Sequence, residues 1–296
     1  MNRFLFFIFG MILAIVLIGG VTYIGANFGN KRELTTTNLS NSENLINTAG
    51  SYSFETNLKT LGFSKELTEN GVFDSGKYQL LAGSLSVEER KIFESSGNEK
   101  IIITPQNNQL YLNLLWGLGL AQENIYLEEL KNLENQGRLG QLASTGGWNI
   151  AQGDATLHFI RHNILNLSLE QQRRVANIAA TIYRPCCGNS ARFADCNHGM
   201  AMLGVVSLAV SQGLSDEEIY RTALGFNSLW FPSQYDQMAQ YFKIFEKKET
   251  NQVNPKTALS AKFSSGQGFS QNVAKPLVLL NNPSGASGSG GDSCSL

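Results

Sequence analysis

The stretch Tyr183-Arg-Pro-Cys-Cys-Gly-Asn-Ser-Ala-Arg-Phe-Ala-Asp-Cys-Asn-His-Gly-Met200 holds most of the metal-binding and redox-active side chains of the chain. Three of the four cysteines (Cys186, Cys187 and Cys196) and one of the three histidines (His198) fall within thirteen residues. Composition alone is not expected to gather so few thiols and imidazoles in one place. We therefore take this stretch as the predicted functional centre.

The same stretch separates two predicted helices. A capping box of Ser and Gln opens a helix over 168–183, which Pro185 interrupts. Asp195 or Asn197 is predicted to cap the next helix, over 200–212, which ends at a glycine. A brief strand is considered at 101–104, and the apolar helix 110–120 is expected to be buried. Further helices are predicted at 86–93, 123–134, 157–165, 215–230 and 233–247. The fold class is therefore mostly α.

The predicted helix start favours a reactive thiol. Cys186 and Cys187 lie in the connecting loop, whereas Cys196 and His198 lie at the N-terminus of the next helix. Unpaired backbone amides and the helix dipole at that end stabilise negative charge. A thiol placed there has a lowered pKa, which suits both metal binding and redox attack.

The residue types favour a transition-metal ion, copper or zinc. Thiolates with imidazoles form a sulfur and nitrogen ligand set typical of zinc, and soft thiolates also suit copper(I). The predicted first ligands are Cys186, Cys187, Cys196 and His198. His158 and His162 are second-choice ligands, because an i, i+4 spacing places both on one face of the predicted helix. Asp195 is expected to act as a helix cap or as a hydrogen-bonding partner of a ligand.

Two other functions remain open at this stage. In thiol–disulfide exchange, Cys187 or Cys196 would be the attacking thiolate and another cysteine would resolve the mixed disulfide. In a purely structural role, Cys186 or Cys187 would pair with Cys196 and staple a scaffold that binds a protein partner. Whether the chain is an enzyme is left open.

The range 183–235 resembles the thiol-oxidoreductase subunit family of cytochrome c maturation. The resemblance rests on the Cys186-Cys187 loop, on the helix start at Asp195-Cys-Asn197, and on Gly213-Leu-Ser-Asp-Glu-Glu-Ile219 before a final helix. It implies a three-helix unit on a membrane anchor that carries out thiol chemistry. Arg184 occupies the position of the family's first redox cysteine, so only the second cysteine of the family's redox pair has a counterpart here, which is Cys187. Pro185-Cys-Cys-Gly also resembles exported proteins with a Pro-Cys-x-Cys-Gly-Cys motif, which implies metal binding.

The N-terminus predicts a membrane anchor. No charged residue occurs between Arg3 and Lys31, and the range 4–26 is almost entirely apolar. A run of about 20 apolar residues is long enough to span a bilayer as a helix, and longer than the core of most cleavable signal peptides. We therefore expect a single-pass protein whose main domain is extracytoplasmic, with a signal peptide as the alternative.

The predicted domain plan follows from composition. It comprises an anchor at 1–30, a flexible tether at 31–51, a helical domain at 52–248 and a disordered tail at 249–296. The thiol and histidine unit occupies about 155–248 of that domain. With a formal net charge of -1 and no basic stripe, nucleic acid is not an expected partner. The expected partners are the membrane, through the N-terminal helix, and another exported or membrane protein.

Overall fold

The computed structural model describes residues 53–95 and 97–281. The chain divides into two compact units, 1–40 and 41–296, and the description below concerns the second unit alone. The predicted anchor, the predicted tether and Cys294 lie outside the described residues and stay predictions. Within the described part, no helix combines the length and the apolar character needed to cross a bilayer.

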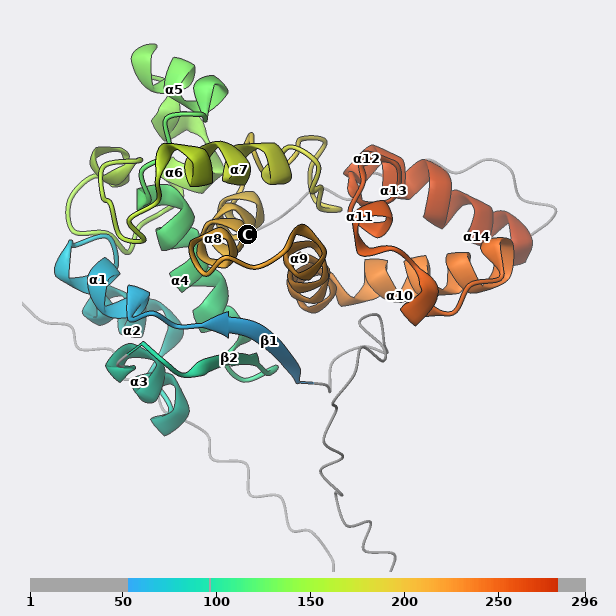
Figure 1. The fold of residues 1–296 in the computed structure, drawn as a ribbon, viewed down its shortest axis with the longest axis horizontal. Helices are drawn as coiled ribbons and strands as arrows, with labels where there is room; N and C mark the ends of the chain where they lie inside the picture. Colours follow the sequence, from blue (N-terminus) through green and yellow to red (C-terminus); the bar gives the residue numbers. More distant parts are fainter. Residues whose placement is uncertain (1–52, 96, 282–296) are drawn as a thin grey trace, which may run out of the picture. The chain divides into compact units, whose positions relative to one another are not determined.

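The described residues are mostly helical, as the sequence predicts, with one pair of strands (Figure 1). The elements of the first half are β1 (Phe54–Lys59), α1 (Phe63–Glu69), α2 (Ser75–Ala82), α3 (Val87–Glu94), β2 (Lys100–Ile103), α4 (Asn108–Ala121), α5 (Glu128–Asn135), η1 (Leu139–Gln141), α6 (Ala143–Gly146) and η2 (Ala155–His158). Those of the second half are α7 (Leu169–Ala179), α8 (Asn197–Ser211), α9 (Asp216–Trp230), α10 (Pro232–Tyr241), η3 (Phe242–Glu246), η4 (Thr250–Gln252), α11 (Pro255–Ala258), α12 (Ala261–Ser264), α13 (Gly266–Phe269), η5 (Ser270–Ala274) and α14 (Lys275–Asn281).

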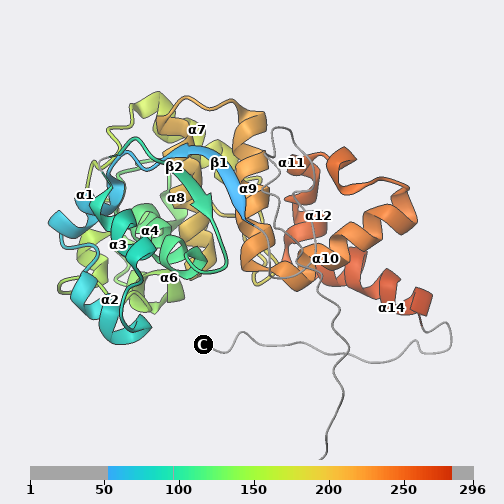
Figure 2. The same ribbon diagram turned by 90° about the horizontal axis from the view of Figure 1, so that it is seen from below.

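Helices α4 and α8 form the centre of the core, and both views show them side by side (Figures 1 and 2). Nearly every residue of each helix is buried, which confirms the predicted buried helix at 110–120. A Cβ atom at Gly119 would lie 2.0 Å from the carbonyl oxygen of Met200, and one at Gly204 would lie 2.1 Å from that of Leu115. The two backbones therefore touch directly, which fixes α8 firmly against α4.

The strands β1 and β2 pair antiparallel, with Phe54 opposite Ile103 and Lys59 opposite Lys100. The pair packs on α9 through an aromatic contact, because the rings of Phe54 and Phe226 meet edge to face at 6.4 Å. Gly225 makes room for this contact, since a Cβ atom there would lie 2.3 Å from the Phe54 ring. The brief strand considered at 101–104 is thus present, one residue earlier.

Local sequence signals at the helix ends are largely confirmed. Three predicted capping boxes form, each with both reciprocal hydrogen bonds. They are Ser86 with Glu89, Ser168 with Gln171, and Ser215 with Glu218. Pro232 occupies the first turn of α10, where the missing amide hydrogen costs nothing.

Four predictions about local structure are wrong. The helix expected over 123–134 begins only at Glu128. The helix expected over 157–165 is a 3-10 turn followed by irregular chain, because Ile160 adopts a left-handed conformation with φ 48°. The cap of α8 is Cys196 itself rather than Asp195 or Asn197. The helix expected over 168–183 ends at Ala179.

The disorder predicted from residue 249 onward is also wrong for the residues described there. Helices α11 to α14 occupy most of 255–281 (Figure 1). Their apolar side chains, including Leu259, Phe263 and Val273, are buried in the common core. The segment is short of charge and rich in Ser and Gly, but its regularly placed apolar residues are sufficient to anchor single-turn helices. Residues 282–296 lie outside the described part.

Candidate metal centre

The loop between α7 and α8 folds back on itself and brings its cysteines together. The amides of Ala191 and Arg192 donate to the carbonyls of Ile182 and Ala179, at 2.8 and 3.2 Å. This short ladder returns the chain to the start of α8, so that Cys196 faces the turn that carries Cys186 and Cys187. The sequence prediction that these three residues form one cluster is confirmed at the level of geometry.

The three sulfur atoms lie close enough to share one ion. The Sγ atom of Cys186 is 3.4 Å from that of Cys187 and 3.7 Å from that of Cys196. All three sulfurs lie within 4.8 Å of one another, and all three residues are free thiols of intermediate exposure. Within 53–95 and 97–281, no other three His, Cys, Asp or Glu residues meet this spacing.

Cys196 is at once a helix cap and a member of the cluster. Its Sγ atom accepts a hydrogen bond from the backbone amide of Gly199 at 3.3 Å, in the position that a serine or aspartate oxygen usually takes. The Nε atom of Arg184 also donates to this sulfur, at 3.3 Å. Positive charge and an unpaired helix amide thus meet on one sulfur atom, which stabilises the thiolate.

Arg184 is completely buried, and its guanidinium group links Cys196 to the loop that carries the other two cysteines. Nη1 donates to the carbonyl of Asn189 at 2.6 Å, and Nη2 donates to Oδ1 of Asp195 at 2.5 Å. The side chain of Asn189 in turn donates to Oδ2 of Asp195 at 2.5 Å. Gly199 leaves room for the guanidinium, since a Cβ atom there would lie 2.6 Å from Nη2. Asp195 therefore orients Arg184; it neither caps α8 nor bonds a predicted ligand, the two roles expected of it from the sequence.

The protonation states of the cysteines differ because they interact. Hydrogen bonds from Cys186 and Cys187, together with the charge of Arg184, hold the pKa of Cys196 far below its usual range. Hydrogen bonds to Cys187 and Cys196, with burial, hold the pKa of Cys186 far above it. For Cys187, the hydrogen bond with Cys186 lowers the pKa, but the Cys196 thiolate and burial outweigh it and raise the pKa to about 12. These shifts favour the thiolate form at Cys196 and the thiol form at Cys186 and Cys187.

None of the three histidines joins the three sulfurs, which corrects the predicted ligand set. The ring of His198 packs against two aromatic rings, with centroid distances of 4.6 Å to Phe231 and 5.8 Å to Trp230. Burial there lowers the pKa of His198, which favours the neutral form of the ring. His158 and His162 contact each other instead, through a ring-nitrogen distance of 3.0 Å.

The C-terminal helices form a wall of the centre that the sequence did not reveal. The amide of Tyr183 donates to the carbonyl of Leu259, and the amide of Gly266 donates to the carbonyl of Cys187, each at 2.8 Å. A Cβ atom at Gly266 would lie 3.1 Å from the carbonyl oxygen of Pro185. The small residues that suggested disorder are therefore the ones that allow this close approach.

A buried polar chain ties the same wall to the loop. The side-chain amide of Asn227 donates to the carbonyl of Tyr183 at 2.9 Å and to the hydroxyl of Tyr235 at 3.0 Å. The Tyr235 hydroxyl also contacts Oγ of Ser264 at 2.7 Å. Burial raises the pKa of Tyr235, so the hydroxyl stays protonated. The sequence shows Asn227 and Tyr235 only as polar residues of two neighbouring predicted helices, and periodicity alone does not indicate that they bond each other.

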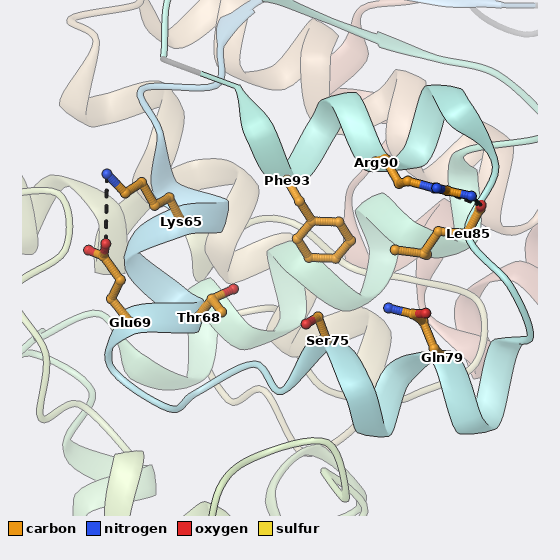
Figure 3. A pocket seen from close by; sticks show the side chains of 8 residues that line it. All are labelled: Lys65, Thr68, Glu69, Ser75, Gln79, Leu85, Arg90 and Phe93. Atoms are coloured by element: carbon orange, nitrogen blue, oxygen red, sulfur yellow. Dashed lines mark hydrogen bonds and ion pairs between the residues drawn. The ribbon is translucent and has the colours of Figure 1, made fainter.

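A separate cavity of about 340 Å³ lies among α1, α2 and α3 (Figure 3). Its charged groups are already engaged with each other or with the backbone. Lys65 pairs with Glu69 at 3.7 Å, and Nη2 of Arg90 donates to the carbonyl of Leu85 at 3.2 Å. No cysteine or histidine lines this cavity, so the thiol cluster remains the strongest candidate site.

Comparison with protein-family models, with curated proteins and with solved structures finds no match to this chain. The resemblance over 183–235 stays a prediction.

Proposed function

We propose that this chain binds one thiophilic transition-metal ion, copper(I) or zinc, through the sulfur atoms of Cys186, Cys187 and Cys196. The observation that carries the proposal is the sulfur spacing. With a metal–sulfur bond of about 2.3 Å, two sulfurs on one tetrahedral ion lie about 3.8 Å apart, and on a trigonal ion about 4.0 Å apart. The sulfur–sulfur distances of 3.4 and 3.7 Å in the structure are close to these values.

The charges around the cluster support the same proposal. Cys196 is already a thiolate, so it offers an ion its first ligand without losing a proton. Cys186 and Cys187 keep their protons until a metal displaces them, because metal coordination requires the thiolate form. Binding of one ion is thus coupled to the release of two protons at neutral pH. Arg184 offsets part of the negative charge of three thiolates.

The donor set distinguishes the two metals. Copper(I) is satisfied by two or three soft sulfur ligands, whereas structural zinc sites have four protein ligands. With His198 packed against Phe231, zinc would need water as its fourth ligand. The three-sulfur arrangement therefore favours copper(I) over zinc.

Thiol–disulfide exchange is the second candidate, and a specific observation favours it. The Cys196 thiolate lies 3.7 Å from Sγ of Cys186, so the two are placed to form a disulfide. In this mechanism Cys196 attacks a substrate disulfide, and Cys186 then resolves the mixed disulfide with release of the reduced substrate. The attacking thiolate would be Cys196 and the resolving thiol Cys186, which is one of the combinations that the sequence leaves open.

Elemental analysis of the purified full-length chain separates the two functions. The full chain is required because 255–281 contact the thiol loop. We expect one copper or zinc per chain after reconstitution under reducing conditions, two protons released per ion, and three thiols that become reactive only after chelation. The variant Cys294→Ser should behave like the wild type, whereas serine at any of the three cluster positions should weaken binding. A reduced chain that takes up neither ion contradicts the proposal, and a Cys186–Cys196 disulfide formed with oxidised glutathione would then support exchange.

A further inference from the structure

The turn that follows η2 brings two imidazoles into direct contact. Nδ1 of His158 lies 3.0 Å from Nε2 of His162, and the rings stack with an interplanar angle of 24°. Both side chains are partly buried, so the pair is reachable from solvent without being free to rotate. This pair is separate from the three sulfurs of the thiol cluster.

The backbone of the turn is fixed against the end of α4. The amide of Ile160 donates to the carbonyl of Leu120 at 2.8 Å, and that of His162 donates to the carbonyl of Ala121 at 3.0 Å. The carbonyl of His162 accepts from the amide of Glu123 at 2.9 Å. Ile160 is held at φ 48°, a conformation that a β-branched residue adopts only under constraint. Strain of this kind, about 1–3 kcal/mol, is concentrated at functional sites.

A backbone carbonyl selects the protonation pattern of the pair. Nε2 of His158 lies 3.0 Å from the carbonyl oxygen of Gln152, which accepts its hydrogen. The lone pair of His158 therefore resides on Nδ1 and points to His162. A histidine that binds a metal through one nitrogen usually donates its other ring hydrogen to a carbonyl or carboxylate, as His158 does here. Asp154 lies four residues before His158, and hydrogen bonds from the backbone amide and the hydroxyl of Thr156, each at 2.9 Å, lower the pKa of its carboxyl group and keep it charged.

We propose that Nδ1 of His158 and Nε2 of His162 bind one divalent transition-metal ion of the copper and zinc type, at a second site independent of the thiol cluster. With metal–nitrogen bonds of about 2.0–2.1 Å, two cis ligands lie about 2.9 Å apart at a right angle and about 3.4 Å apart at a tetrahedral angle. The observed 3.0 Å falls within that interval. On binding, the hydrogen of His162 moves from Nε2 to Nδ1, so the neutral pair loses no net proton. Water completes the coordination of the ion.

The test uses Cu²⁺ as the probe in a full-length chain without cluster thiols, Cys186→Ser/Cys187→Ser/Cys196→Ser. Serine at position 196 retains a side-chain oxygen for the cap of α8. We expect one Cu²⁺ per chain, with pulsed electron paramagnetic resonance showing coupling to two imidazole nitrogens. His158→Gln and His162→Gln should each weaken binding by about tenfold or more and leave coupling to one imidazole. Arg161→Gln, in the same turn, is the matched control and should bind as the parent does.

A second measurement covers the case in which this triple variant does not fold. The wild-type chain is dialysed against excess Zn²⁺, and the bound zinc is counted with and without His158→Gln. A wild-type chain that holds one zinc ion more than the variant supports the second site. Equal zinc content in both chains overturns the proposal, as does copper coordination by the triple variant without imidazole signals. Both outcomes are independent of whether the thiol cluster itself binds metal, since only the difference made by His158 is read.

Discussion

Replacing Arg184 by Met tests whether the buried guanidinium stabilises a thiolate. The substitution keeps an unbranched side chain but removes three hydrogen bonds, to the sulfur of Cys196, the carbonyl of Asn189 and the carboxylate of Asp195. Hydrogen bonds to charged groups contribute about 1.5–3 kcal/mol each. Their sum overestimates the loss, because Asp195 is 28% exposed and keeps its bond from Asn189, while the sulfur keeps the Gly199 amide. We therefore expect Arg184→Met to lower the free energy of unfolding by about 3 kcal/mol, the lower end for breaking a buried ion pair.

A double-mutant cycle with Cys196→Ser isolates the contribution of the thiolate. Serine caps the helix but carries no charge, so the loss caused by Arg184→Met should shrink by about 1.5 kcal/mol in that background, the value of one charged hydrogen bond. The measurement is urea unfolding of the metal-free, reduced full-length chain at pH 8, with chelator and reductant present. If the two losses agree within about 0.5 kcal/mol, the reasoning is refuted, because Arg184 then acts through packing and Asp195 alone.

Three further predictions concern the same region. Gly199→Ala should destabilise the chain by about 1–2 kcal/mol and weaken metal binding, because the new Cβ atom would displace Arg184. The control is Gly188→Ala, which has open space around it and should change neither thermal unfolding nor metal affinity. The stability of the metal-free chain should peak near the ordinary thiol pKa of about 8.5. Below that pH the contribution of Cys196 to stability falls because its pKa in the folded state is depressed. Above that pH the contribution of Cys186 and Cys187 falls because their pKa values in the folded state are raised. Unfolding measured across pH 6–11 checks this, and a stability that rises steadily to pH 11 contradicts it. Deleting 255–296 should expose the thiol loop and raise the rate of alkylation of the metal-free thiols, measured with a maleimide reagent; an unchanged rate would show that α11 to α13 do not cover the loop.

The sequence predicts the parts of this fold that short-range physics determines. Capping boxes, the apolar helix 110–120 and the gathering of cysteines depend on residues within a few positions of each other. His198 shows where this reasoning failed. It follows Cys196 by two positions, and side chains two apart on a helix point in different directions, so His198 turns to Phe231 while Cys196 turns to the loop. The helical geometry that placed Cys196 correctly thus excludes the histidine predicted beside it.

Long-range contacts account for the rest. The sequence distinguishes Arg184 only because it stands where the resembling family has a cysteine. No local pattern shows that a charged residue will be fully buried, as Arg184 is. The C-terminal helices resembled a disordered tail because the small residues needed at Gly266 and Ser264 are the ones that also compose flexible segments. The two histidines at 158 and 162 fit a helical spacing, but hydrogen bonds to α4 impose a different turn that the local sequence does not specify.

The two halves of the thiol centre differ in how firmly they are held, and this determines what moves when an ion binds. Cys196 begins α8, and α8 contacts α4 backbone to backbone at Gly119 and Gly204, so a shift of this sulfur would disturb the whole core. Cys186 and Cys187 lie in a loop that is joined to the C-terminal helices by single hydrogen bonds, to Leu259 and Gly266. An increase in sulfur spacing from 3.4 Å toward about 3.8 Å is therefore taken up by the loop and by α11 to α13. Metal binding should accordingly slow hydrogen exchange at the amide of Gly266 more than at the amides in the middle of α8, which are protected with or without the ion.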